Sequence, residues 1–222
     1  MYDAADMWTK EYTTTSEIMY PPEPLIRTLK GSYSGLKMPK PKPGDTVLDV
    51  GCGDGRNFPL FASLRMQPGG TEITNDIVSS LRKQFPSVDL RVGTCAALPW
   101  ADASFDYLVT WNSCYYMSLD GSRFGYHVAE MARVIKPSGW IICSVPKTTH
   151  EIFTNAEFDD LHCTIRGDRF ELRNGERMRW FSGSDKLQEA FSYSFTNFCH
   201  ASIQDDMYGH AYHWHVIVAQ RT

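Results

Sequence analysis

The chain has 222 residues, of which 42% are apolar and 13% aromatic, enough for one sizeable domain with a well-packed core. Its net charge of −4 argues against a large phosphate-binding surface, so we expect no nucleic-acid partner. No apolar run approaches the roughly 20 residues that span a bilayer, and the N-terminus is too polar for a signal peptide. We therefore expect a cytoplasmic protein without a membrane partner. The six scattered cysteines, without a CxxC pair, are typical of buried thiols in a reducing compartment.

Residues 1–44 are interrupted by prolines and are expected to form an N-terminal lid, with a short helix over 24–31. From residue 46, short apolar runs alternate with helical patterns, which predicts a parallel, doubly wound sheet. The predicted strands are 46–50, 71–74, 88–92, 105–111 and 140–145; the predicted helices are 56–65, 75–84 (with Asn75 or Asp76 near its cap) and 122–136.

After residue 146 the alternation stops, and residues 147–190 are interpreted as an insertion beside the acceptor. Strands over 163–165 and 169–172 are expected to form a hairpin around Arg166-Gly167-Asp168, followed by a helix over 184–190. Residues 191–203 and 211–219 predict a terminal antiparallel pair. The whole chain is thus expected to be one α/β domain, with five parallel strands, this antiparallel pair and helices on both faces.

The stretch VLDVGCGDGRN, residues 47–57, joins a strand to a helix through Gly51, Gly53 and Gly55. Glycine there lets the backbone approach a ligand closely. The spacing is GxGxG rather than the GxGxxG of dinucleotide-binding folds, and Asp49 suits a ligand ammonium better than a pyrophosphate. Glu72 ends the next strand, where an acid can accept both ribose hydroxyls. NAD-dependent enzymes share this feature, so Glu72 indicates a ribose rather than a particular cofactor.

Four motifs, in fixed order over residues 47–146, resemble those of the class I S-adenosylmethionine-dependent methyltransferases. They are VLDVGCGDGRN, TEIT, GTCAALPWADASFDYLV and RVIKPSGWIICSVP. The resemblance implies a Rossmann-like seven-stranded fold and S-adenosyl-L-methionine as cofactor. It implies Glu72 at the ribose and Ile73 at the adenine. Thr94 replaces the family's usual Asp, and Trp111 a usually smaller residue. The cofactor-binding residues that it implies are Asp49, Gly51, Cys52, Gly53, Asn57, Glu72, Ile73, Thr94, Cys95, Ala96 and Trp111. Residues 133–137 would form only a turn.

The acceptor is expected beyond the fourth and fifth strands, where ligands of doubly wound sheets bind. His150 is the candidate base and Tyr116 a candidate hydrogen-bonding group. We expect methyl transfer to O or N of a small molecule or sugar, by a monomer or homodimer. The aromatic residues expected at the acceptor are Trp8, Tyr12, Tyr20, Tyr115, Tyr116, Trp180 and Phe181.

Several alternatives remain open. They are a protein or nucleic-acid methyltransferase, a non-catalytic S-adenosylmethionine-binding module, and a dinucleotide-dependent oxidoreductase, which the GxGxG spacing disfavours. Arg177 and Arg179, with Glu176, are candidates for binding an anionic acceptor, but a solvated or ion-paired surface is the preferred interpretation. His213 and His215 share one face of a strand behind Asp205 and Asp206, but half-exposed packing is the preferred interpretation, so we expect no metal site.

Overall fold

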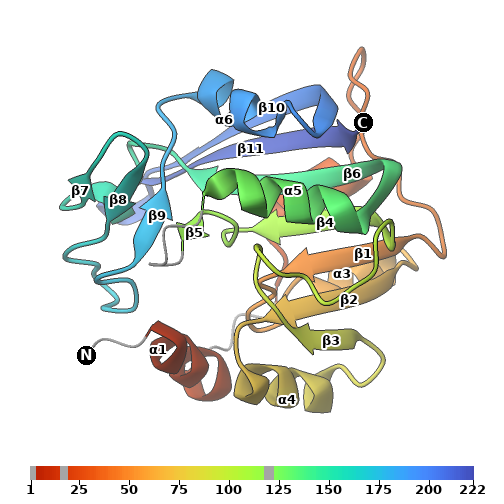
Figure 1. The fold of residues 1–222 in the computed structure, drawn as a ribbon, viewed down its shortest axis with the longest axis horizontal. Coiled ribbons are helices and arrows are strands. Elements are labelled where there is room, and N and C mark those ends of the chain that lie inside the picture. The colour runs from red at the N-terminus through yellow and green to blue at the C-terminus, as the bar shows by residue number, and fades with distance from the viewer. Residues whose placement is uncertain (1–3, 16–19, 118–122) are drawn as a thin grey trace.

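The computed structural model describes residues 4–15, 20–117 and 123–222. Its main sheet has seven strands in the order β10-β11-β6-β4-β1-β2-β3 (Figure 1). Neighbours from β6 to β3 pair in parallel, whereas β10 and β11 pair antiparallel, as predicted. The strands are β1 (Thr46–Val50), β2 (Gln67–Glu72), β3 (Asp89–Val92), β4 (Phe105–Trp111), β6 (Ile135–Pro146), β10 (Phe195–Asp205) and β11 (Tyr212–Arg221).

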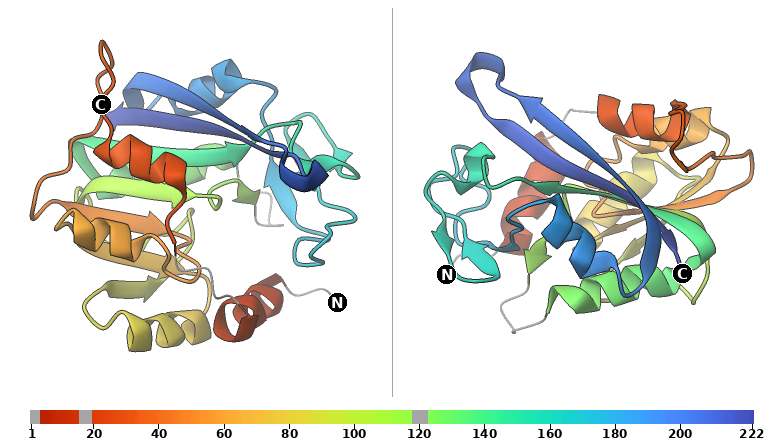
Figure 2. Two further views of the ribbon diagram at one scale, coloured as in Figure 1. Left: turned by 180° about the vertical axis from the view of Figure 1, so that it is seen from behind. Right: turned by 90° about the horizontal axis from the view of Figure 1, so that it is seen from above.

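Helices cover both faces of this sheet because the central strands are apolar on both faces (Figure 2). Along β4, Leu108 points into one apolar cluster, and Tyr107 and Val109 into the other. The helices α5 (Phe124–Val134) and α6 (Ser184–Phe191) pack into the first cluster. The second contains side chains of α2 (Glu23–Lys30), α3 (Phe58–Ser63) and α4 (Asn75–Gln84).

A second, four-stranded sheet lies beyond the carboxyl ends of the parallel strands (Figure 1). Its order is β5 (Tyr116–Met117), β9 (Arg177–Arg179), β8 (His162–Thr164) and β7 (Glu157–Phe158). The N-terminal helix α1 (Ala4–Lys10) and the π-helical η1 (Glu11–Thr15) lie at the same end of the molecule. Short 3-10 turns η2 (Glu151–Phe153) and η3 (Met207–Gly209) complete the chain. No helix of the described residues is long and apolar enough to cross a membrane.

Four predicted boundaries are wrong. The strand β2 begins at Gln67 rather than residue 71, because Gly69 and Gly70 leave room for the rings of Phe105 and Phe58. The strand β10 begins at Phe195 rather than residue 191, because α6 continues to Phe191 and a turn follows it. The strand β6 begins already at Ile135, pairing with Phe105 ahead of a register shift. Of the predicted turn at 133–137, residues 133–134 therefore end α5 and residues 135–137 belong to the strand.

The fourth error is the hairpin. The strand β8 pairs with β7 and β9 instead of residues 169–172. Residues 169–172 belong to a turn in which Asp168 Oδ2 accepts the amides of Leu172 and Arg173. A side chain that bonds the backbone of its own loop in this way competes with strand pairing.

Candidate functional site

The glycine loop follows β1 and has the backbone that the sequence predicts. Gly51 and Gly53 have φ of 67° and 59°, in the left-handed region that favours glycine. A Cβ at Gly51 would lie 2.6 Å from Cβ of Ser113, so this glycine permits close packing against the segment after β4. A Cβ at Gly53 would lie 3.0 Å from the Tyr12 ring of η1. Gly53 is therefore the position where the loop faces the N-terminal segment.

Two buried carboxylates flank this loop. Asp49 Oδ2 accepts a hydrogen bond from Asn57 Nδ2 (3.0 Å), and Glu72 accepts the amides of Gly53 (2.6 Å) and Ile73 (3.1 Å). Burial raises the pKa of each carboxyl group to about 7, and these hydrogen bonds only partly oppose it. A cationic ligand would favour the ionised forms. The site therefore suits a ligand with a positive charge and free hydroxyl donors.

Asn57 adds an unsatisfied acceptor beside Asp49. Its side chain is 3% exposed, and no group of the described residues bonds Oδ1. Buried polar atoms normally have a partner, and Oδ1 is available to a ligand donor. The oxygens of Asp49 and Asn57 thus fit a ligand ammonium, as the resemblance implies for the methionine end of the cofactor.

The residues expected to contact the adenine, 73 and 94–96, include exposed side chains and a loop whose polar groups hydrogen-bond one another. Ile73 is 39% exposed at the end of β2, and the Thr94 and Ala96 side chains are exposed. The Thr94 amide donates to the Ala97 carbonyl (3.1 Å), and Thr94 Oγ1 accepts the Ala96 amide (3.3 Å). Cys95 is buried, so only its backbone is available to a ligand.

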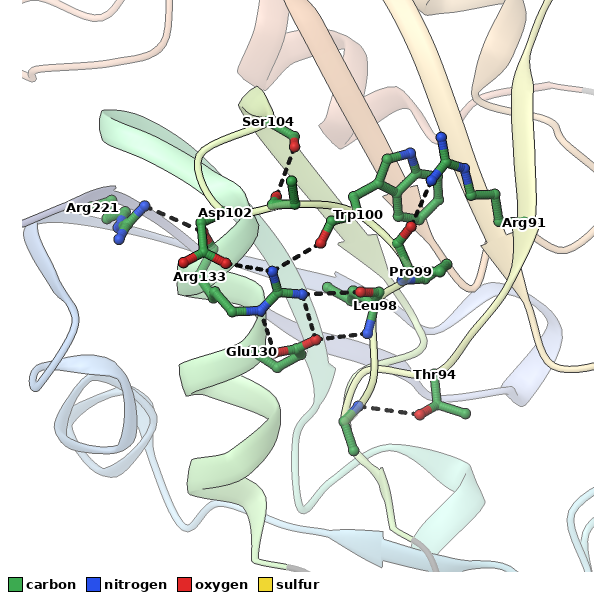
Figure 3. Close-up of polar contacts among 12 residues, drawn as sticks. Arg91, Thr94, Leu98, Pro99, Trp100, Asp102, Ser104, Glu130, Arg133 and Arg221 are labelled. Atoms are coloured by element: carbon green, nitrogen blue, oxygen red, sulfur yellow. Dashed lines mark hydrogen bonds and ion pairs between the residues drawn. The ribbon is translucent and has the colours of Figure 1, made fainter.

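An arginine that the sequence interpretation treated as part of a turn holds this loop in place (Figure 3). Arg133 donates to the carbonyls of Leu98 (3.0 Å) and Trp100 (2.8 Å) and pairs with Asp102 (2.7 Å) and Glu130 (2.8 Å). Glu130 Oε1 also accepts the Leu98 amide (2.8 Å). The motifs LPW (residues 98–100) and RVIKP (beginning at Arg133) follow one another along the chain, and this order is the signal that could have revealed their contact.

Two residues of the implied set point away from the loop. Cys52 and Trp111 are 4% and 7% exposed, and both side chains belong to the apolar cluster beneath α2 and α3. Burial raises the pKa of the Cys52 thiol well above its usual range, which makes it unreactive. Any contact of these two residues with a cofactor would be made by the backbone.

Tyr116, the candidate acceptor contact, lies in an aromatic cluster between the second sheet and α1. Its ring stacks on Tyr115 (centroids 4.9 Å apart) and meets the edge of Trp8 (6.0 Å), which stacks on Tyr12 (5.6 Å). Arg173 Nε donates to the Tyr116 hydroxyl (3.3 Å). Four expected aromatic residues thus meet.

The three other expected aromatic residues lie elsewhere. Tyr20 is 80% exposed, Trp180 packs on Phe158, and Phe181 packs against Phe124 in the core. Nothing in the sequence pattern singled out Arg173.

His150 is buried, and its tautomer follows from its contacts. Nδ1 accepts the Ile152 amide (3.0 Å), so the neutral ring carries its hydrogen on Nε2, which no group of the described residues bonds. Burial, assisted by the charge of Arg173, lowers the pKa of His150 to about 4. In this state Nε2 is a donor. A base at Nε2 would need the opposite tautomer, so this geometry favours hydrogen-bond donation over proton abstraction.

The remaining candidate residues have local partners. His213 bonds Asp206 (2.9 Å) and Thr149 (2.8 Å), and the described chain contains no group of three side chains that would hold a metal. Arg177 Nη2 contacts His162 Nδ1 (3.1 Å), and Arg179 lies over the Phe181 ring (4.3 Å).

Two surface hollows of about 680 and 650 Å³ lie away from these residues. The larger is lined by Lys42, Tyr107 and Lys136, near the amino ends of β1 and β4. Ligands of doubly wound sheets bind at the opposite, carboxyl ends of the strands. The glycine loop, the two carboxylates and the aromatic cluster are all at that carboxyl end, which is why we place the site there.

Comparison with known proteins identifies a matching family and proteins of similar fold. Residues 48–143 match the protein family described as "Methyltransferase domain". A probable S-adenosylmethionine-dependent methyltransferase of Mycolicibacterium smegmatis is 34% identical over 103 residues, which cover 46% of this chain and 38% of that protein. The match thus spans well under two thirds of that relative.

Two solved structures share the fold at 17% identity. The putative methyltransferase in complex with the Haloferax volcanii Trm112 methyltransferase activator has a TM-score of 0.67, with 100% of this chain and 99% of that chain covered. The Burkholderia thailandensis 1,6-didemethyltoxoflavin-N1-methyltransferase, bound to 1,6-didemethyltoxoflavin and S-adenosylhomocysteine, has a TM-score of 0.60, with 81% and 72% covered.

Proposed function

We propose that this protein transfers a methyl group from S-adenosylmethionine to O or N of a small molecule or sugar. The proposal starts from residues 48–143, whose matches indicate a class I S-adenosylmethionine-dependent methyltransferase domain. The observation that carries the proposal is the pair of buried carboxylates, Asp49 and Glu72, on either side of the glycine loop. A pyrophosphate would meet like charge at Asp49, which disfavours a dinucleotide and its hydride chemistry.

The residues of the loop have distinct proposed tasks. Asp49 and Asn57 Oδ1 accept from the ammonium of the methionine end, and Glu72 accepts from the ribose hydroxyls with the lone pairs that the amides of Gly53 and Ile73 leave free. The exposed Ile73 side chain packs against the adenine. When bound, S-adenosylmethionine supplies the methyl group on a sulfonium together with its own leaving group.

The protein's remaining task is to orient the acceptor and to exclude water. Tyr116 has the proposed task of a hydrogen bond to the acceptor. Its membership of the aromatic cluster that adjoins the glycine loop through Tyr12 supports this role. His150 Nε2–H serves as a donor in the tautomer that its contacts select. The small-molecule acceptor of the Burkholderia thailandensis structure supports this acceptor class.

The test is to follow tritiated methyl groups from S-adenosylmethionine into a cell extract separated into small-molecule, protein and nucleic-acid fractions. We expect label in the small-molecule fraction, and less of it with the Glu72→Ala variant at a low concentration of S-adenosylmethionine. Label in protein or nucleic acid would instead support one of the other two acceptor classes. Binding of S-adenosylhomocysteine without transfer to any fraction would support a non-catalytic module.

A further inference from the structure

We propose that the acceptor site takes an aromatic carboxylic acid, whose carboxylate binds Arg173 and whose ring packs in the aromatic cluster of Trp8, Tyr12, Tyr115 and Tyr116. This inference rests on the proposed function and specifies its substrate class. It depends on three features of the described residues: the position of the cluster, the state of Arg173, and the free donor of His150.

The aromatic cluster adjoins the glycine loop directly. The Tyr12 ring approaches within 3.0 Å of the Cβ position of Gly53, and Trp8 stacks on Tyr12 with centroids 5.6 Å apart. Trp8 in turn meets Tyr116 edge to face at 6.0 Å. Trp8 also donates from Nε1 to Glu176 (3.3 Å), which ties α1 to the segment before β9. A flat ring held among these side chains would lie beside the cofactor loop, where an acceptor must be.

Arg173 supplies the positive charge beside this cluster, and its hydrogen bonds leave a donor free for a ligand. Only 25% of its side chain is exposed, and its guanidinium lies 5.5 Å from the centroid of the Trp8 ring. Its contact with Asp168 is long, at 3.3 Å, compared with about 2.7–2.9 Å for a strong charged pair. Asp168 Oδ2 also accepts the amides of Leu172 and Arg173. Nη2 of Arg173 has no hydrogen-bond partner among the described residues, so an edge of the planar fork can bind a carboxylate.

His150 provides a second unpartnered donor in the same surroundings. Its ring meets Trp214 edge to face at 4.6 Å, and Trp214 lies 6.3 Å from Tyr115. The charge of Arg173 is close enough to help lower the pKa of His150, which keeps the imidazole neutral and Nε2 protonated. A cation and a buried neutral donor together favour an anionic group.

The charge of Arg173 also decides between two ligand classes. Aromatic rings alone attract cations such as amines. An ammonium group beside Trp8 and Tyr116 would be repelled by Arg173, whose Nε donates to the Tyr116 hydroxyl and whose guanidinium lies over the Trp8 ring. An aromatic carboxylate instead gains both the ring contacts and the charged hydrogen bonds.

The test is calorimetric titration of the S-adenosylhomocysteine complex with matched pairs of ligands. The probes are benzoate, 4-hydroxybenzoate and indole-3-acetate, each against its uncharged amide, with benzylamine as the cationic comparison. We expect at least one acid to bind roughly tenfold to a hundredfold more tightly than its amide, the effect of a hydrogen bond to a charged group. Equal binding of every acid and its amide, preference for benzylamine, or no binding of any acid at millimolar concentration would overturn the proposal.

Variants assign the preference to one residue. Arg173→Gln should abolish the preference for the acid, and Arg173→Lys should keep part of it because the charge remains. Arg169→Gln is the matched control, since Arg169 lies over the same Phe170 ring (4.8 Å against 5.9 Å for Arg173) but has 45% of its side chain exposed. A preference that survives in folded Arg173→Gln would refute the assignment. Failure of the wild-type protein to bind S-adenosylhomocysteine would refute the proposed function instead.

Discussion

Replacing Asp49 by Asn should stabilise the protein without ligand at high pH and leave its stability nearly unchanged at low pH. The carboxyl group is 1% exposed, and burial raises its pKa to about 7, against an ordinary value of about 4 in the unfolded chain. Between these two pH values the folded state binds more protons than the unfolded state. Stability from this group is therefore fully present below about pH 4 and is lost as pH rises through about 7.

The expected magnitude follows from the size of that pKa change. It corresponds to on the order of 4 kcal/mol at and above about pH 8, where wild-type Asp49 must be ionised in the fold. The asparagine has no charge to bury and still accepts a hydrogen bond from Asn57 Nδ2. Its advantage over the wild type should grow by about 2–4 kcal/mol between about pH 5 and about pH 8, a large part of a typical domain's stability.

The assay is urea denaturation of both proteins at about pH 5 and about pH 8. Asp106→Asn is a control of opposite sign. Burial would raise the pKa of Asp106, but hydrogen bonds from Lys136 and Thr46 outweigh it and hold that pKa below its usual value. That substitution should therefore cost similar stability at both pH values. An equal effect of Asp49→Asn at both pH values, or a larger destabilisation at about pH 8, would refute the reasoning.

Three further predictions concern the loop and its support. Calorimetry should show the affinity for S-adenosylhomocysteine rising about tenfold per pH unit up to about pH 7, since the ligand ammonium needs ionised Asp49; a flat profile would contradict this. Arg133→Ala should lower the free energy of unfolding by about 2–4 kcal/mol in urea and weaken cofactor binding, because the loop of Figure 3 loses its ion pairs and carbonyl bonds. The control is Arg65→Ala, which removes an exposed side chain just after α3 and should do neither. Gly53→Ala should cost about 1–2 kcal/mol, as φ is 59° and the new Cβ would press on Tyr12; thermal unfolding unchanged from wild type would show that the loop is free there.

The sheet could be predicted well because its signals are local. Apolar runs bounded by polar or glycine residues predicted β1, β4 and β11 nearly at their observed positions, and the alternation with helices predicted that the central strands pair in parallel. The glycine loop was equally visible, since a strand, three spaced glycines and a helix are contiguous in the chain. Glu72 could be placed because the carboxyl ends of parallel strands meet at one edge.

The contacts that complete the site are not local, and the sequence did not reveal them. Trp8 and Tyr116 are far apart in the chain and meet only because α1 folds against the second sheet. Arg173 comes from a loop without periodicity, and its importance depends on the burial of Tyr116 and the hydrogen bonds of Asp168. The tautomer of His150 depends on the Ile152 amide in η2, a 3-10 turn that no pattern predicted.

The most direct test of the account is calorimetric titration of the whole chain with S-adenosylhomocysteine and, in parallel, with NADH. The account predicts binding of S-adenosylhomocysteine at one site and none of NADH. It also predicts a loss of about 1–3 kcal/mol of binding free energy for Glu72→Ala, the effect of losing a charged hydrogen-bond partner. Binding of NADH, or an affinity for S-adenosylhomocysteine that Glu72→Ala leaves unchanged, would contradict it.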